Sequence, residues 1–210
     1  MYTDGACPNN GTPDAYGGFG IAANLETPSV GSYWIQTSYP WGDFLKERYG
    51  EPTNQKCELA AVMFTVRGFA HAVYHSPENH FWDSEGRITV NMRIHSDSKY
   101  VVDGINTWMH NWRKNDWKNS KKKPIANMQM WKDLDNMLNY GHLRGVFSFY
   151  HVAGHSGDAG NDSADEAANK GAEMALEGKT VLTELDWEQF IDFVEERPAI
   201  VTKGAIYDFK

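Results

Sequence analysis

The chain has 210 residues, of which 41% are hydrophobic, and a formal net charge of −8. This length is sufficient for one domain with its own core. The two cysteines, Cys7 and Cys57, exclude a disulfide framework, and the absence of a CxxC pair argues against a cysteine zinc site. No apolar run reaches the roughly 18–20 residues that cross a membrane, and no signal-peptide pattern opens the chain.

These properties favour a reducing, intracellular environment without membrane association. We expect a monomer located in the nucleus or mitochondrion if the source is eukaryotic, and otherwise in the cytoplasm. Charge is unevenly distributed, because residues 112–123 carry a net +5 and the other 198 residues carry −13. A local basic patch on an acidic body is typical of nucleic-acid contact.

The first half of the chain predicts three strands and one helix. "MYTDGA" at residues 1–6 resembles the end of a strand, so either the sequence was cut from a longer chain or this strand is short. Two further strands are predicted at 16–24 and 31–39. Residues 40–52 are interpreted as an irregular insertion. Helical spacing of apolar residues then predicts a helix from Asn54 to Tyr74.

The second half alternates loops, strands and helices. The predicted elements are a polar loop at 76–87, a strand at 87–97, a helix at 98–112, a helix at 124–140 with Pro124 in its first turn, a strand at 145–152, a helix at 161–176 and a short acidic helix at 183–199. This order predicts an α/β fold with a mixed five-stranded sheet flanked by helices on both faces. We expect one domain over residues 1–178 and an acidic extension, 179–210, packed on it.

Four carboxylates occupy comparable places in this predicted fold. Asp4 ends the first strand, Glu58 lies on the first helix, Asp97 joins a strand to a helix, and Asp165 lies on the helix after a glycine-rich loop. Active sites of open α/β sheets collect at strand ends and helix starts. Clustered carboxylates repel one another unless cations neutralise them, and oxygen-only ligands suit Mg²⁺ or Mn²⁺.

Each carboxylate also has an ordinary structural explanation. Asp4 could be a turn residue, Asp97 could cap the following helix, and Glu58 could be a solvated helix residue. Asp165 could pair with a lysine on the helix surface. No single residue decides between the two interpretations.

The flanking sequences carry a family resemblance. "YTDGACPNNG", "TNQKCELAA", "SDSKYVVDGI" and "GHSGDAGNDSADEAA" resemble, in order, the four signature blocks of ribonuclease H, type 1, and they span residues 2 to 168. "WMHNWRKNDWKNSKKKP", residues 108–124, resembles the basic protrusion of cellular and bacterial members and is called the handle below. The resemblance implies an RNase H-like fold and endonucleolytic hydrolysis of the RNA strand of RNA–DNA hybrids, leaving 5′-phosphate and 3′-hydroxyl ends.

The same resemblance implies roles for individual residues. Asp4, Glu58, Asp97 and Asp165 would bind two Mg²⁺ ions, with Mn²⁺ as an alternative, and Asp4 would bridge them. His155 would aid proton traffic or product release from a mobile loop, although a turn hydrogen bond would also explain it. The implied nucleic-acid contacts are Cys7, Asn10, Thr53, Asn54, Gln55, Tyr100, Trp108, Lys114, Lys118, Lys121, Lys122, Lys123 and Asn127.

Several of these contacts have specific expected partners. Asn10, Asn54 and Gln55 would contact the hybrid near the cut, and Cys7 would do so through its backbone. Thr53 and Asn127 would grip a DNA phosphate, but many relatives carry Arg where this chain has Glu51. Arg48 could substitute for that cation, and otherwise the grip should be weak. Tyr100 and Trp108 would line the DNA channel, with core packing as the alternative.

Two rival functions remain open from the sequence. One is a non-catalytic hybrid-binding module, which the complete set of four carboxylates disfavours. The other is the ribonuclease H subdomain of a retroelement polymerase, which the handle and the acidic extension disfavour.

Overall fold

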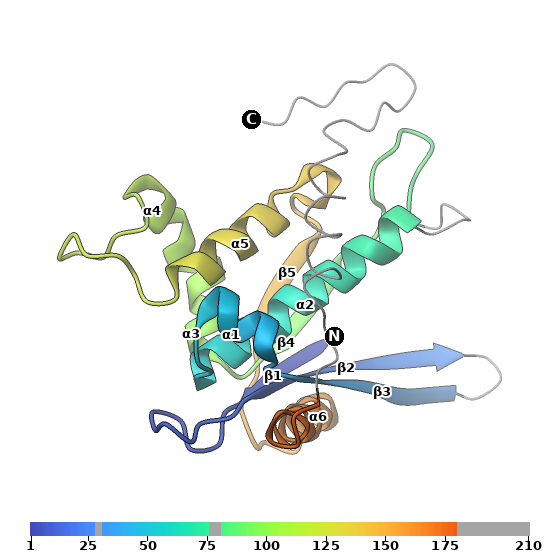
Figure 1. Ribbon diagram of the computed structural model, residues 1–210. Coiled ribbons are helices and arrows are strands. Elements are labelled where there is room, and N and C mark those ends of the chain that lie inside the picture. The colour runs from blue at the N-terminus through green and yellow to red at the C-terminus, as the bar shows by residue number, and fades with distance from the viewer. Residues whose placement is uncertain (28–30, 76–80, 180–210) are drawn as a thin grey trace.

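The computed structural model describes residues 1–27, 31–75 and 81–179, and it contains one mixed sheet with the strand order β3-β2-β1-β4-β5 (Figure 1). The strands are β1 (Tyr2–Ala6), β2 (Gly18–Thr27), β3 (Gly31–Pro40), β4 (Met92–Ser96) and β5 (Phe147–His151). β1 pairs antiparallel with β2 and parallel with β4, and β4 pairs parallel with β5. The predicted mixed five-stranded α/β fold is therefore confirmed.

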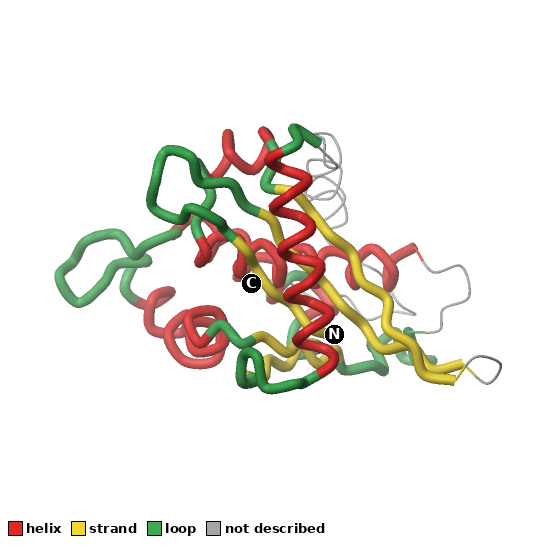
Figure 2. Tube along the Cα trace, turned by 90° about the horizontal axis from the view of Figure 1, so that it is seen from below, coloured by secondary structure: helices red, strands yellow, loops and turns green. Residues whose placement is uncertain are grey.

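Helices cover both faces of the sheet. They are α1 (Asp43–Tyr49), α2 (Asn54–His75), α3 (Lys99–Asp103), the π-helical η1 (Gly104–Trp108), α4 (Met109–Lys114), α5 (Met128–Leu138), the 3-10 turn η2 (Gly141–Leu143) and α6 (Ala159–Leu176). α6 packs along β1, β2 and β3, while α2 packs on the other side of β1 and against α5 (Figures 1 and 2). No helix in the described part of the chain has the length and hydropathy needed to span a bilayer.

The prediction of an irregular insertion at 40–52 is wrong, because this segment contains α1. Gly42 and Gly50 bracket the helix, and together with Pro40 and Pro52 they suggested a loop. The buried side chain of Leu45 anchors the helix to the core. A single buried leucine in seven residues is too weak a periodic signal to reveal a helix from sequence.

Two predicted boundaries are also corrected. α5 begins at Met128, and Pro124 belongs instead to the handle, where it forms an isolated bridge with Lys118. β4 begins at Met92 rather than at residue 87, because Ile88 bridges to Trp82 across a turn. Residues 81–87 form the predicted loop, while 76–80, the tail helix at 183–199 and the extension from 180 onward lie outside the described residues.

The predicted helix at 98–112 is one continuous helical run that includes a π-helical turn, η1. A Cβ on Gly104, the first residue of η1, would lie 2.2 Å from the Trp131 ring. The ring of the fully buried Trp131 therefore occupies the space left by the missing side chain. This contact fixes the helix that carries Tyr100 and Trp108 against α5.

Candidate active site

Three of the four predicted carboxylates converge at the centre of the sheet. Asp4 is the third residue of β1 rather than its end, Glu58 lies in the second turn of α2, and Asp97 follows β4. One oxygen from each carboxylate lies within 4.8 Å of the others. Their elements are far apart in sequence, so the fold itself assembles the cluster.

A glycine sets the distance between Asp4 and Glu58. A Cβ on Gly5 would lie 2.2 Å from the backbone nitrogen of Glu58 and 2.4 Å from the carbonyl carbon of Cys57. No L-residue with a side chain fits there without moving backbone atoms. The backbones of β1 and α2 are therefore in direct contact beside the site, which brings the two carboxylates together.

Replacing Gly5 by alanine should destabilise the protein by at least about 2 kcal/mol and lower its activity, because the new methyl group must push α2 away from β1. Chemical denaturation and hybrid cleavage would measure the two effects. Gly68→Ala in α2 is the matched control, since a Cβ there meets no atom within 4 Å and alanine favours the helix by about 1 kcal/mol. Equal stability of the two variants would contradict the steric argument.

Asp165, on α6, lies beside Asp4, and its negative charge helps to raise the pKa of Asp4. Asn169, one turn later, donates to Asp165 Oδ1 at 3.1 Å. The close approach of α6 depends on glycines in β2, because a Cβ on Gly18 would lie 2.0 Å from Ala172 N and one on Gly20 would lie 2.3 Å from Ala164 O. All four predicted carboxylates are thus neighbours.

The electrostatics of the cluster favour protons or cations. Burial, followed by the negative charge of Asp97, raises the pKa of Asp4 from 3.8 to about 7, against the opposing effect of its bond from Gly5 N–H. Burial and the charges of Asp4 and Asp97 raise the pKa of Glu58 well above its usual value. Glu58 Oε2 is also buried without a hydrogen-bond partner. A divalent cation would satisfy this oxygen and offset the repulsion.

The ordinary explanations for these residues do not match the geometry. The helix after Asp97 has Ser98 at its N-cap position and receives no side-chain cap, so Asp97 is not a capping residue. Glu58 is not a fully solvated helix residue, since its Oε2 is buried. Asp4 lies within a strand rather than in a turn. A turn, a helix cap or a solvated helix position therefore does not explain why these three acids lie where they do.

Residues that the sequence interpretation did not select surround Asp97. The amide of Asn161, which is 2% exposed, lies 3.4 Å from Asp97 Oδ2, and its own Oδ1 is buried without a partner. His151 Nε2 lies 3.1 Å from the Asp97 carbonyl oxygen. A Cβ on Gly154 would lie 2.6 Å from Asp97 Oδ2. The only sequence signal for Asn161 is its position four residues before Asp165 on one helix face.

His155 lies in the exposed loop between β5 and α6 and has a positive φ of 51°. Gly157 also has a positive φ, 79°, so two of the three residues from 155 to 157 have left-handed backbone dihedrals. Asp158 ends the loop by capping α6, since its Oδ1 accepts from Gly160 N and Asn161 N. His155 is therefore held next to the helix that carries Asp165, and its proposed role stays a prediction.

The predicted nucleic-acid contacts fall on several segments. Cys7 is buried, and Asn10, Asn54 and Gln55 are exposed. Thr53 Oγ1 accepts from Lys56 N and so caps the start of α2. Arg48 is paired with Asp133 at 2.9 Å, so its charge is already offset and the structure does not support it as the substitute cation. Tyr49 O–H also donates to Asp133, at 2.7 Å.

Tyr100 combines the two roles considered for it. Its hydroxyl accepts hydrogen bonds from Asn127 Nδ2 at 3.1 Å and from Trp131 Nε1 at 2.8 Å. It thus orients Asn127, whose φ of 54° is left-handed. Trp108 is 37% exposed, and its ring lies 6.3 Å from that of Tyr100. Core packing explains Tyr100 in part, while Trp108 retains a free face.

The handle after α4 is a loop held by local hydrogen bonds. Asn119 Oδ1 accepts from Lys121 N and Lys123 N, and Asn119 N donates to Lys123 O. Ile125 N–H donates to Trp117 O, which closes the base of the loop. The lysine side chains are exposed in this structure, namely Lys114, Lys118, Lys121, Lys122 and Lys123. The loop therefore presents its cations to solvent.

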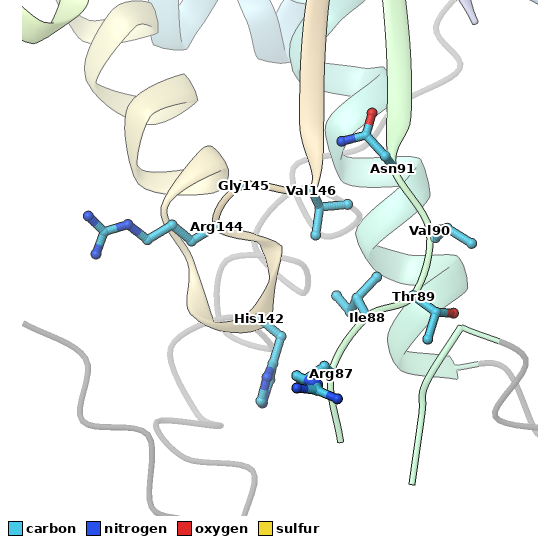
Figure 3. A pocket seen from close by; sticks show the side chains of 9 residues that line it. All are labelled: Arg87, Ile88, Thr89, Val90, Asn91, His142, Arg144, Gly145 and Val146. Atoms are coloured by element: carbon cyan, nitrogen blue, oxygen red, sulfur yellow. The ribbon is translucent and has the colours of Figure 1, made fainter. Parts of the chain in front are cut away.

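A separate cleft of about 450 Å³ lies between residues 87–91 and 142–146 (Figure 3). It opens at the N-terminal ends of β4 and β5, whereas Asp97 follows the C-terminal end of β4. Arg87, His142 and Arg144 are among its lining residues. The cleft is therefore not part of the carboxylate site.

Comparison with known proteins matches this chain to one family over most of its length. The family model described as RNase H matches residues 1–173. Ribonuclease H of Rhodospirillum rubrum is 36% identical over 182 residues, which is 85% of this chain and 86% of that protein. Ribonuclease H of Nitrosomonas eutropha is 31% identical over 181 residues, which is 85% of this chain and 92% of that protein.

Solved structures that contain ribonuclease H domains also match the fold of this chain. The PFV RNase H domain matches with a TM-score of 0.57 and 26% identity, over 82% of this chain and 93% of that one. A foamy viral protease-reverse transcriptase in complex with an RNA/DNA hybrid matches with a TM-score of 0.55 and 26% identity, over 81% of this chain but 19% of that longer chain. With the family model covering most of its length, this chain belongs to the ribonuclease H family.

Proposed function

We propose that this protein is an endonuclease that hydrolyses the RNA strand of RNA–DNA hybrids with the help of two divalent cations, Mg²⁺ in the first instance. The observation that carries the proposal is the convergence of Asp4, Glu58 and Asp97, with Asp165 beside Asp4. Membership of the ribonuclease H family supplies the reaction class. A non-catalytic binding module would have no use for four mutually repelling acids.

The four carboxylates would hold the cations, since their oxygens are the hard ligands that Mg²⁺ and Mn²⁺ prefer. Bound there, a pair of such ions lowers the pKa of a coordinated water and offsets charge on the phosphate, so that hydrolysis leaves 5′-phosphate and 3′-hydroxyl ends. The protein's own contribution is positional. Direct backbone contact at Gly5 fixes Asp4 against Glu58, and Asn161 holds the carboxylate of Asp97. His155 would move protons or help release product at the loop.

The hybrid is the substrate that the surrounding surface fits. The 2′-hydroxyl distinguishes RNA from DNA in every sequence. Asn10, Asn54 and Gln55 offer exposed amides that both donate and accept hydrogen bonds. Trp108 offers a partly exposed ring for sugar or base stacking in the DNA strand. Asn127, oriented by Tyr100, would contact a phosphate of that strand.

Cleavage of end-labelled duplexes tests the proposal directly. With Mg²⁺, the protein should cut the RNA strand of a hybrid and leave duplex RNA and duplex DNA intact. A chelator should abolish the cutting, and end analysis should find 5′-phosphates. Efficient cleavage of duplex DNA, or activity that resists the chelator, would exclude this assignment.

Neutralising three handle lysines, with Lys121, Lys122 and Lys123 all changed to Gln, should weaken hybrid binding and make it less dependent on salt. The slope of log K against log salt should fall by about 2 to 3, because each phosphate contact contributes about 0.9. A variant with Lys46, Lys170 and Lys179 changed to Gln controls for net charge, since these exposed lysines lie outside the handle. Equal slopes for the two variants would show that the handle does not touch phosphate.

A further inference from the structure

Two buried thiols meet beside the carboxylate site. Cys7 follows β1 and is 6% exposed, and Cys57 lies in the first turn of α2 and is fully buried. Both are free, and their side chains lie near enough that Cys57 lowers the pKa of the Cys7 thiol. These 210 residues contain no other cysteine, so a disulfide within them can form only between these two.

The surrounding backbone holds the two thiols together. A Cβ on Gly17 would lie 2.7 Å from Cys57 Sγ, so the sulfur lies against the backbone just before β2, in space that a side chain at Gly17 would need. The backbone N–H of Gly18 also lies beside the Cys57 thiol. The contact at Gly5 fixes β1 against the backbone of Cys57 itself. These contacts hold β1 and the first turn of α2 together, so the two thiols are positioned to approach the short separation that a disulfide requires.

The environment favours Cys7 as the first thiol to react. Cys57 and the nearby ammonium of Lys56 lower the pKa of the Cys7 thiol, against the effect of burial. Lys56 is held in place because its Nζ donates to Glu51 O at 2.6 Å. A lowered thiol pKa beside a lysine and a second cysteine nearby to resolve the oxidised form are two features of oxidation-sensitive cysteines. Of the two sulfurs, Cys7 also belongs to the less buried residue.

We propose that Cys7 and Cys57 form an oxidant-sensitive dithiol that closes to a disulfide and thereby switches off hybrid cleavage. The oxidant is a hydroperoxide. The Cys7 thiolate attacks the hydroxyl oxygen of the hydroperoxide, the O–O bond breaks, and Cys7 becomes a sulfenic acid. The other oxygen leaves as an alkoxide or hydroxide, which takes a proton from water. The sulfur of Cys57 then attacks the Cys7 sulfur, the S–O bond breaks, and the thiol proton leaves with the oxygen as water. Two electrons pass from the thiols to the peroxide.

The effect on cleavage rests on the proposed function. Cys57 directly precedes Glu58, and Cys7 lies three residues after Asp4. A disulfide draws the two sulfurs closer than a non-bonded contact does, so it pulls the first turn of α2 toward the end of β1. Since a displacement of about 1 Å can cost about 100-fold in rate, we expect at least a tenfold loss of activity.

The experiment treats the full chain with hydrogen peroxide and measures both the intact mass and the hybrid-cleavage rate, before and after adding a thiol reductant. We expect a mass lower by two hydrogen atoms, a crosslinked Cys7–Cys57 peptide on digestion under non-reducing conditions, a tenfold or greater fall in rate, and recovery on reduction. Cys57→Ala and Cys57→Ser cannot form the disulfide and should keep their own untreated rates after the same brief exposure, measured before the reductant is added.

The mass measurement needs no nucleic acid, so it stands even if untreated protein does not cleave hybrids. A dithiol that stays reduced while the control thiol glutathione is fully oxidised overturns the proposal, as does a disulfide between two molecules. Formation of the Cys7–Cys57 bond without loss of activity overturns the switch. If the Cys57 variants lose as much activity as the parent protein, the disulfide is not the cause of the inactivation and the switch is overturned.

Discussion

Replacing Asp97 by asparagine should lower the rate of hybrid cleavage by at least about 100-fold, the scale seen when one preorganised electrostatic group is removed from an active site. The amide keeps the shape of the carboxylate but removes its charge, and one oxygen of Asp97 lies within 4.8 Å of those of Asp4 and Glu58. The site would then bind divalent cations less tightly. Single-turnover cleavage of a labelled hybrid at saturating Mg²⁺ measures the effect.

Asp162→Asn is the matched control, because Asp162 is exposed on the same helix as Asp165 and lies outside the cluster. It should cleave at nearly the rate of the parent protein. The metal-free Asp97→Asn protein should unfold at a temperature equal to or above that of the parent, since it loses a repulsive charge. If the folded variant retains more than a tenth of the activity, Asp97 is not part of the catalytic site.

Raising the pH should destabilise the metal-free protein, and Mg²⁺ should reverse this effect. Asp4 has a pKa of about 7 in the folded chain against 3.8 without the burial and charges of the site. The folded state therefore binds this proton more tightly, and protonation favours folding. The stabilisation is complete below pH 3.8 and is lost as the pH rises through about 7. Glu58, whose pKa is raised in the same direction, adds to the trend.

Between pH 5.5 and 8 the free energy of unfolding should fall by about 2 kcal/mol through Asp4, at 1.36 kcal/mol for each pKa unit crossed. Denaturation in chelator at several pH values measures it. Asp4→Asn should lose most of the slope and exceed the parent in stability at pH 8, while Asp162→Asn should keep the slope. If the parent and Asp4→Asn show the same pH dependence, the carboxylates do not repel one another as the structure indicates.

The elements with strong periodic or motif signals could be predicted from the sequence. Helix α2 was predicted from Asn54 to Tyr74 and ends at His75, because its apolar residues recur at helical spacing over six turns. The four carboxylates could be selected because signature blocks surround them. α1 was missed because one buried leucine among turn-forming residues gives no clear period.

Long-range partners could not be predicted. Tyr49 and Asp133 are 84 residues apart, and nothing in the sequence around either residue identifies the other as its hydrogen-bond partner. The same holds for Asn161 and Asp97, which only the folded loop brings together. Gly5 and Gly20 appeared as ordinary strand residues, although each permits a contact with another element that a methyl group would block. Such restrictions depend on the neighbour across the interface, which sequence spacing does not show.

The contact at Gly5 has a consequence for how the protein can evolve. Main-chain atoms, rather than interlocking side chains, determine how near β1 approaches α2. Exchanges among the buried apolar residues of α2, such as Leu59 or Met63, would then change the melting temperature and leave the separation of the acids intact. Lineages could adapt their interior to heat or cold independently of their chemistry.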